Sequence, residues 1–195
     1  DLKSRYLFLK NVKTLEGFLF PDTYRVSSDS SSDTIVKKFL DNFEAKVWED
    51  ALLLTPDLKE KWFSKLIIAS LIEKEVPPSG NDRQLVSGII RKRLSIDMPL
   101  QVDATVVYSK CGGSFVNCEP LTKSDYKIKS VYNTYLASGL PPSPIANPGL
   151  DAISAAVAPK ASEFLYYLSD PATGKTVFSK DLEEHNINRA RYLHL

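Results

Sequence analysis

Apolar residues recur at helical spacing over much of the chain. After Asp33, a residue typical of a helix N-terminus, they return every three or four positions and predict a helix over residues 33–53. Pro56 suits the first turn of a second helical element, and the apolar run 65–75 predicts a third helix, which Pro77 must stop. Three further helices are predicted: from Asn81 or Asp82 to about Leu94, with the basic run Arg91-Lys92-Arg93 on its outer face, at about 149–157, and at about 181–193.

Strand character appears in two places. Apolar and polar residues alternate from Leu100 to Tyr108, which predicts a strand. The apolar segments 164–169 and 175–179 flank a Pro- and Gly-containing turn and predict a β-hairpin. Early helices and later strands indicate the α+β class: a helical N-terminal half packed on a small antiparallel sheet. We expect one domain over residues 1–195, with an extended N-terminal segment over residues 1–30.

Charge and composition exclude some functions. The 195 residues include 25 Lys and Arg and 24 Asp and Glu, for a net charge of +1. Such a chain has no basic field to attract nucleic acid, so a nucleic-acid-binding role is disfavoured. No apolar run approaches the roughly 20 residues of a membrane span. His185 and His194 lie far in sequence from both cysteines and lack ligand spacing, so we predict no metal site and no cofactor.

Cys111 and Cys118 flank a loop-like segment that begins with two glycines. A disulfide that closes this loop is geometrically plausible and would suit an oxidising compartment. Two free thiols are the equally weighted alternative.

Glu75 is the first candidate for chemistry. It lies at helical spacing from Ile68, Leu71 and Ile72, so the four residues share one face. A carboxyl that continues an apolar stripe is partly desolvated, and a helix C-terminus disfavours negative charge, so both effects raise its pKa. A general acid near neutral pH needs that environment. The alternative is a Glu whose stem packs while its head reaches solvent, and Glu73, on another face, is the rival carboxylate.

Polar side chains on the predicted strand are further candidates. Gln101, Asp103 and Thr105 lie on one face of it, where they can hydrogen-bond a sugar or peptide or form a solvated outer face. Asp103 is also the candidate second carboxylate of a glycosidase pair. Asn133 and Tyr135 offer an amide and a ring, although aromatic rings more often fill cores than stack on sugars.

The Pro-rich segment 139–149 cannot form a regular helix. A rigid loop that also carries apolar residues usually holds a shape, and we expect it to form the wall of a cleft. Its candidate contacts are Leu140, Pro141, Pro142, Ile145 and Asn147.

Four segments together resemble one family. Their order and spacing, over nearly the whole chain, are similar to those of the YceG-like endolytic murein transglycosylases. The segments are Glu16–Tyr24, Ala69–Glu75, Leu100–Tyr108 and Tyr132–Gly149.

The resemblance implies an activity. Family members cut peptidoglycan strands internally, between N-acetylmuramic acid and N-acetylglucosamine, without adding water. The muramic 6-hydroxyl attacks its own anomeric carbon and leaves a 1,6-anhydro end. One Glu acts first as acid and then as base, and the matching residue here is Glu75. The resemblance also implies substrate contact or site support for Gln101, Asp103, Thr105, Tyr108, Asn133, Tyr135, Leu140, Pro141, Pro142, Ile145 and Asn147.

The resemblance further implies a location and partners. Family members carry an N-terminal membrane anchor and a small LysM-like region before this segment. We therefore expect a catalytic domain that acts at the extracytoplasmic face of the bacterial cell membrane. Its expected partners are peptidoglycan strands and, as candidates, cell-wall synthesis proteins, with contact to the membrane only through the anchor.

Two other functions stay open. A hydrolase that uses Glu75 with Asp103 would produce reducing ends instead of anhydro ends. A glycan-binding scaffold that kept the fold would bind strands without cutting them.

Overall fold

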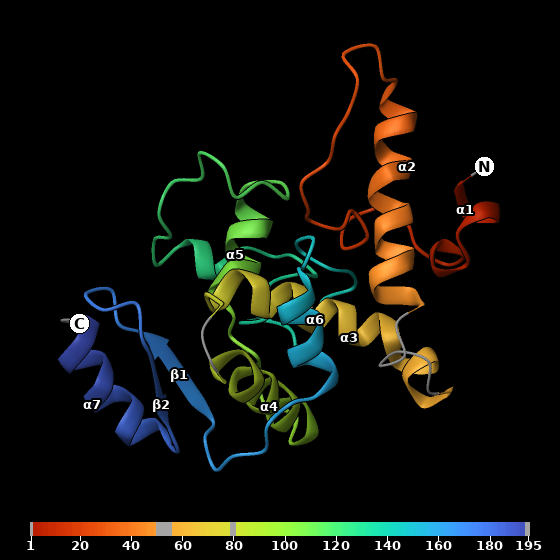
Figure 1. Ribbon diagram of the computed structural model, residues 1–195. Coiled ribbons are helices and arrows are strands. Elements are labelled where there is room, and N and C mark those ends of the chain that lie inside the picture. Colours follow the sequence, from red (N-terminus) through yellow and green to blue (C-terminus); the bar gives the residue numbers. More distant parts are fainter. Residues whose placement is uncertain (1, 50–55, 79–80, 194–195) are drawn as a thin grey trace.

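The computed structural model describes residues 2–49, 56–78 and 81–193. Four helices occupy the middle of the molecule, with α1 and α2 on one side and a hairpin with α7 on the other (Figure 1). The helices are α1 (Leu2–Arg5), α2 (Ser32–Phe43), α3 (Pro56–Glu75), α4 (Asp82–Ser95), α5 (Asp103–Lys110), α6 (Leu150–Val157) and α7 (Leu182–Leu193), and the strands are β1 (Tyr166–Ser169) and β2 (Thr176–Ser179).

Helix α3 is the centre of the core. It packs against α4, α5 and α6, and every residue from Leu66 to Ile72 is buried. A helix that is buried all round belongs to the interior of a domain. The two helical elements predicted here are one continuous helix, because nothing in the sequence interrupts it before the Val76-Pro77 stop.

The predicted strand over residues 100–108 is wrong. Residues from Asp103 onward form α5, and Ala104, Thr105 and Val106 are all buried, which alternation would not allow. Thr and Val have a low helix propensity, but packing against α3 outweighs that preference. Of the two residues before the helix, Val102 is extended while Gln101 has a left-handed backbone. Their amides donate to the side-chain and backbone oxygens of Thr134, respectively.

The hairpin prediction is confirmed. Strands β1 and β2 pair antiparallel, with Tyr167 opposite Phe178 and Tyr166 opposite Ser179. Because side chains alternate across a strand, Tyr167 packs towards the core while Tyr166 stacks on His185 of α7. The fold is thus α+β, with a two-stranded sheet attached to a helical core.

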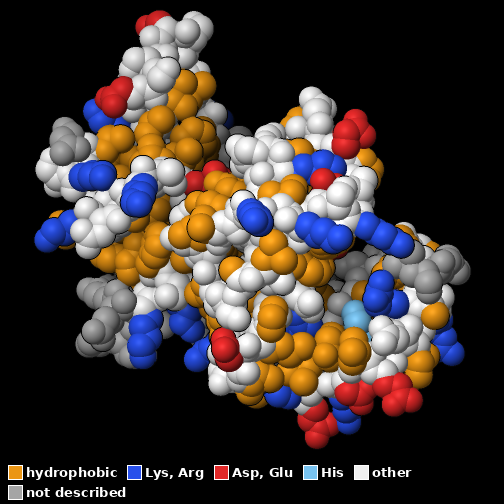
Figure 2. Space-filling model, turned by 180° about the vertical axis from the view of Figure 1, so that it is seen from behind, with side chains coloured by type: hydrophobic (Ala, Val, Ile, Leu, Met, Phe, Trp, Pro, Cys, Tyr) orange, Lys and Arg blue, Asp and Glu red, His pale blue; other side chains and the backbone are white. Residues whose placement is uncertain are grey.

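The N-terminal segment is not extended throughout. Besides α1 it contains a 3-10 turn (Leu7–Leu9), and Phe8 and Phe18 stack in an aromatic cluster that also holds Phe43. Helix α2 begins after Ser31, whose hydroxyl caps it, and continues as a π-helix (Glu44–Trp48). The end of the predicted helix, residues 50–53, lies outside the described residues. Apolar side chains are exposed at the surface on the side of the molecule that holds α2 (Figure 2).

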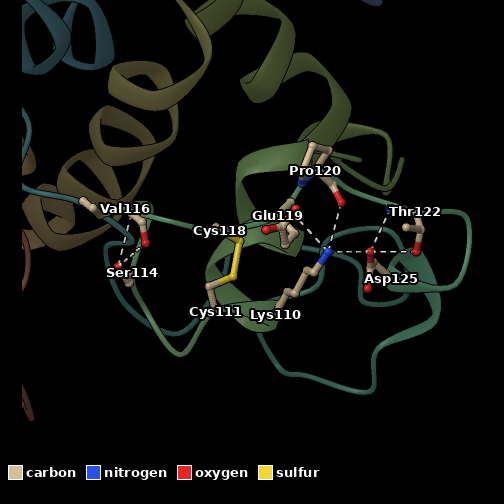
Figure 3. The surroundings of a disulfide bond; sticks show 9 residues. All are labelled: Lys110, Cys111, Ser114, Val116, Cys118, Glu119, Pro120, Thr122 and Asp125. Carbon is tan, nitrogen blue, oxygen red and sulfur yellow. Dashed lines mark hydrogen bonds and ion pairs between the residues drawn. A yellow bond between two sulfur atoms is a disulfide. The ribbon is translucent and has the colours of Figure 1, made fainter.

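A disulfide joins Cys111 and Cys118, so the structure selects the bonded alternative. Beside it, Lys110 donates to the carbonyls of Glu119 and Pro120 and pairs with Asp125 of a second 3-10 turn (Asp125–Lys127) (Figure 3). The loop after α5 is therefore fastened at both ends. In the part of the chain that the structure describes, no helix is both long and apolar enough to cross a membrane.

Candidate functional site

Glu75 ends α3 with its carboxyl between two other elements. The backbone N–H of Ala104, in the first turn of α5, donates to Oε1 at 3.3 Å. The Tyr167 hydroxyl, from β1, donates to Oε2 at 3.2 Å. The residue as a whole is half-buried, and its carboxyl is held from two sides.

The pKa of Glu75 is raised to about 7. Burial is the main cause, because removing water disfavours the charged form, and the negative charge of Asp103 adds to it. The hydrogen bonds from Ala104 and Tyr167 oppose the shift, since both favour the carboxylate. The carboxyl can therefore hold or release a proton near neutral pH, which suits acid–base chemistry.

Glu73 has a different environment. Its two oxygens face the guanidinium of Arg83, each at 3.3 Å, and one also accepts from the Gly149 N–H at the start of α6. Arg83 is buried and donates through Nε to the carbonyl of Val76. One arginine thus holds the chain on both sides of Glu75, and Glu73 joins α3 to α4 and α6.

Asp103 and Gln101 are both exposed, and the charge of Asp103 acts on Glu75. Asp103 is the first residue of α5, next to the amide that holds Glu75, and it accepts from the Tyr135 hydroxyl at 2.5 Å. Burial and the charge of Asp103 raise the pKa of Tyr135 well above its usual value, so the phenol stays protonated. Gln101 has a left-handed backbone (φ 51°), which turns the chain into α5.

The structure places three of the predicted contact residues in the interior. Thr105, Asn133 and Ile145 are each 0% exposed. The Thr105 hydroxyl donates to Val102 and bonds Thr134, while Asn133 spans the carbonyls of Tyr126 and Ile128. These side chains have no exposed surface, so of the two roles expected of them, substrate contact or site support, their geometry fits support.

The Pro-rich segment is tied to several distant parts of the chain. Asn147 accepts from the amides of Gly17 and Leu19 at 2.7 and 3.2 Å. The Ile145 amide donates to Ser70 in the middle of α3. In this segment Pro141 is buried, Leu140 and Asn147 are half-buried, and Pro142 is exposed.

Tyr108 and Tyr132 connect α5 to this segment. Their rings lie 4.8 Å apart, and the Tyr132 hydroxyl bonds Ser143 at 2.7 Å. Burial and the charge of Glu16 raise the pKa of Tyr108 to about 12. Tyr108 is half-buried, so part of its ring faces the surface on the same helix as Asp103.

Tyr167, Arg83 and Arg93 were not among the site residues predicted from the sequence. Arg93 was expected on an outer face but is buried, and it donates to the carbonyls of Leu165, Pro99 and Leu100. It therefore fixes the segment before β1 against the segment before α5. The adjacent tyrosines that open β1 were the available signal for Tyr167, and they do not distinguish Tyr167 from Tyr166.

Two hollows lie away from these residues. One of about 320 Å³ is lined by Leu7, Phe8 and Trp62 among others, and one of about 240 Å³ by residues between Leu2 and Leu15. Neither contains a carboxylate, and neither touches Glu75 or its partners.

Comparisons with known proteins agree with one another. The sequence profile of the YceG-like family matches residues 1–191. The endolytic murein transglycosylase of Bacillus subtilis is 35% identical over 195 residues, and that of Streptococcus pneumoniae strain R6 is 34% identical over 184 residues. A crystal structure of a YceG-like protein from Listeria monocytogenes superposes with a TM-score of 0.82 at 34% identity, covering 96% of this chain and 62% of that one.

The chain spans only part of these relatives. The alignment with the Bacillus protein includes 99% of this chain but 52% of that protein. The alignment with the Streptococcus protein includes 92% of this chain but 32% of that protein. The likeness therefore concerns a shared segment.

Proposed function

The chain belongs to the YceG-like family, and on that premise we propose that it is the catalytic segment of an endolytic murein transglycosylase with Glu75 as its acid and base. The observation that carries the proposal is the Glu75 carboxyl: half-buried, held at both oxygens, and with a pKa raised to about 7. The names of the Bacillus and Streptococcus relatives supply the substrate, murein.

The proposed reaction needs one protein carboxyl. Protonated Glu75 gives its proton to the glycosidic oxygen as the bond from the muramic anomeric carbon breaks. The muramic 6-hydroxyl forms the new bond to that carbon, and the Glu75 carboxylate takes the hydroxyl proton. No water is consumed, and Glu75 ends the cycle protonated. A pKa near the working pH serves both halves, because each form must be accessible.

Neighbouring residues receive proposed roles from their exposure. Gln101, Asp103 and Pro142 are exposed and Tyr108, Tyr135 and Leu140 half-buried, so we assign them glycan contacts. Thr105, Asn133, Pro141, Ile145 and Asn147 hold the surrounding segments in place. The proposed location is the extracytoplasmic face of the membrane, as the resemblance implies, and the disulfide suits an oxidising compartment.

Product analysis tests the proposal. Purified peptidoglycan is digested in water enriched in ¹⁸O, and the fragments are separated and weighed by mass spectrometry. We expect unlabelled 1,6-anhydro ends, and none from Glu75→Gln. Glu73→Gln is the matched control, because it changes a carboxylate two residues away. Undiminished anhydro products from Glu75→Gln would overturn the assignment.

A hydrolase is the second candidate, favoured by one observation. The charge of Asp103 acts on Glu75, as expected of a glycosidase pair. The hydroxyl of Tyr135 already occupies one Asp103 oxygen, so we rank this candidate second. It predicts ¹⁸O-labelled reducing ends and an Asp103→Asn variant nearly as inactive as Glu75→Gln. Binding of strands without any cleavage would instead indicate a scaffold.

A further inference from the structure

We propose that Tyr167 is a positioning residue that serves both protonation states of Glu75, with its hydroxyl accepting from the acid and donating to the carboxylate. Its catalytic consequence rests on the proposed function above, but the contact itself does not. No sequence motif pointed to Tyr167, which lies 92 residues after Glu75 in the hairpin.

The two oxygens of Glu75 have unequal partners. Oε1 faces the backbone N–H of Ala104, a group that can only donate. Oε2 faces the Tyr167 hydroxyl, which can donate or accept. A proton on Oε1 would weaken the hydrogen bond from Ala104. A proton on Oε2 can instead form a hydrogen bond to the phenol oxygen, once the Tyr167 hydroxyl has rotated its own hydrogen away. The mobile proton of Glu75 therefore belongs on Oε2, beside Tyr167.

The surrounding charges keep Tyr167 neutral. Burial and the Glu75 carboxylate raise its pKa well above the usual value, and Asp103 of α5 acts in the same direction. Arg93 of α4 opposes them without reversing the shift. Nearby Tyr135 is likewise held protonated by burial and by Asp103. Glu75 is thus the one group of this set that changes charge near neutral pH, and Tyr167 follows it by rotating a hydroxyl.

The hairpin supplies a matched control. Tyr166 precedes Tyr167 on β1 and points to the other face, where its ring stacks on His185 with centroids 5.0 Å apart. Changing either tyrosine to Phe keeps the ring and removes one hydroxyl. An effect of Tyr167→Phe that Tyr166→Phe does not share therefore belongs to the contact with Glu75.

Kinetics of strand cleavage test the catalytic part. We expect Tyr167→Phe to lower kcat about tenfold to a hundredfold, the loss that corresponds to one hydrogen bond to a charged group, while KM changes less than about twofold. The hydroxyl bonds the charged carboxylate more strongly than it bonds the acid, so its loss should raise the Glu75 pKa and move the alkaline limb of the pH–rate profile to higher pH. Tyr166→Phe should match the wild type in kcat, in KM and in the pH–rate profile. A Tyr167→Phe variant with unchanged kcat and pH profile would overturn the proposal.

A titration of the resting protein tests the contact without any turnover. The Glu75 carboxyl carbon is followed by ¹³C NMR between pH 4 and pH 9, with Glu75→Gln identifying its signal. We expect Tyr167→Phe to raise the Glu75 pKa above that of the wild type and Tyr166→Phe to leave it in place. An unmoved pKa in Tyr167→Phe would refute the inference while leaving the proposed function intact. A moved pKa in a protein that forms no anhydro ends would instead refute the function alone.

Discussion

Glu73 and Glu75 lie two residues apart on the same helix, and their surroundings differ. Glu73 faces the buried guanidinium of Arg83 and the N-terminus of α6, so its charge is compensated. Glu75 faces a backbone amide and a phenol, so it has hydrogen bonds but no positive charge among them. The first carboxylate fastens three helices, while the second holds a proton to about pH 7.

The difference shows that the partner, and not the helix face alone, decides what a carboxylate does. Both glutamates follow the stretch of α3 from Leu66 to Ile72, in which every residue is buried. An arginine compensates the charge of Glu73, whereas burial without a positive partner among its hydrogen bonds raises the pKa of Glu75. Four experiments can break or sharpen this contrast.

Catalysis should separate the two residues most. We expect Glu75→Gln to lower kcat/KM by about 10² to 10⁴, the usual contribution of a general acid, and Glu73→Gln to lower it less than about tenfold. Cleavage rates on isolated glycan strands measure both. Equal losses of kcat/KM in the two variants would mean that Glu73 and Glu75 differ in their contacts but not in their importance for catalysis.

Stability should separate them in the opposite sense. Glu73→Ala leaves Arg83 buried without its carboxylate, and we expect a loss of about 2 to 4 kcal/mol in the free energy of unfolding, as for a broken buried pair. The double change Glu73→Leu with Arg83→Met should recover much of it, because no unpaired charge remains. Urea unfolding gives these values, and a loss below about 0.5 kcal/mol would show that solvent already screens the pair.

The pH dependence of stability should single out Glu75. Its pKa is raised in the folded protein, so its contribution to stability is present at low pH and is lost as pH rises through about 7. Glu75→Gln does not titrate, and its stability relative to the wild type should increase between pH 5 and pH 8 by about 2 kcal/mol. Unfolding at both pH values measures this, with Tyr166→Phe as the control. A pH-independent difference would contradict the raised pKa.

Lys74, between the two glutamates, should matter least. Its ammonium lies 4.1 Å from the Phe115 ring centroid in the disulfide loop. Burial raises the pKa of Glu16, and the charge of Lys74 opposes that shift. We expect Lys74→Met to cost about 0.5 to 1 kcal/mol, as for an exposed cation–π contact, and to leave cleavage rates within about twofold. A large loss of activity would show that the contacts of Glu75 do not explain its behaviour by themselves.

Local patterns predicted the helices and the hairpin well. Periodicity and Pro77 gave the end of α3, and the turn signal gave β1 and β2. They failed at α5, where Thr and Val form a pattern typical of a strand and only the packing on α3 favours a helix. They also failed for Arg93, because a basic residue in a run of three does not show which carbonyls it will meet.

Only part of the candidate site was predicted, because local patterns do not show which distant groups a residue will meet. The position of Glu75 follows from residues near it in the sequence, and its catalytic role stays a prediction. Its partners do not follow from local sequence, because the Ala104 amide is a backbone group that any residue would supply. Tyr167 faces Glu75 only by the register of a hairpin, which no neighbouring residue of Glu75 encodes.

The contacts of Glu75 reach 29 and 92 residues forward along the chain. A polypeptide emerges from the ribosome N-terminus first and folds as it emerges. A nascent or prematurely terminated chain that ends before β1 therefore contains the carboxyl but lacks the hydroxyl beside it. For an enzyme proposed to cut the wall that holds a cell together, this order of assembly ties full activity to the synthesis of β1.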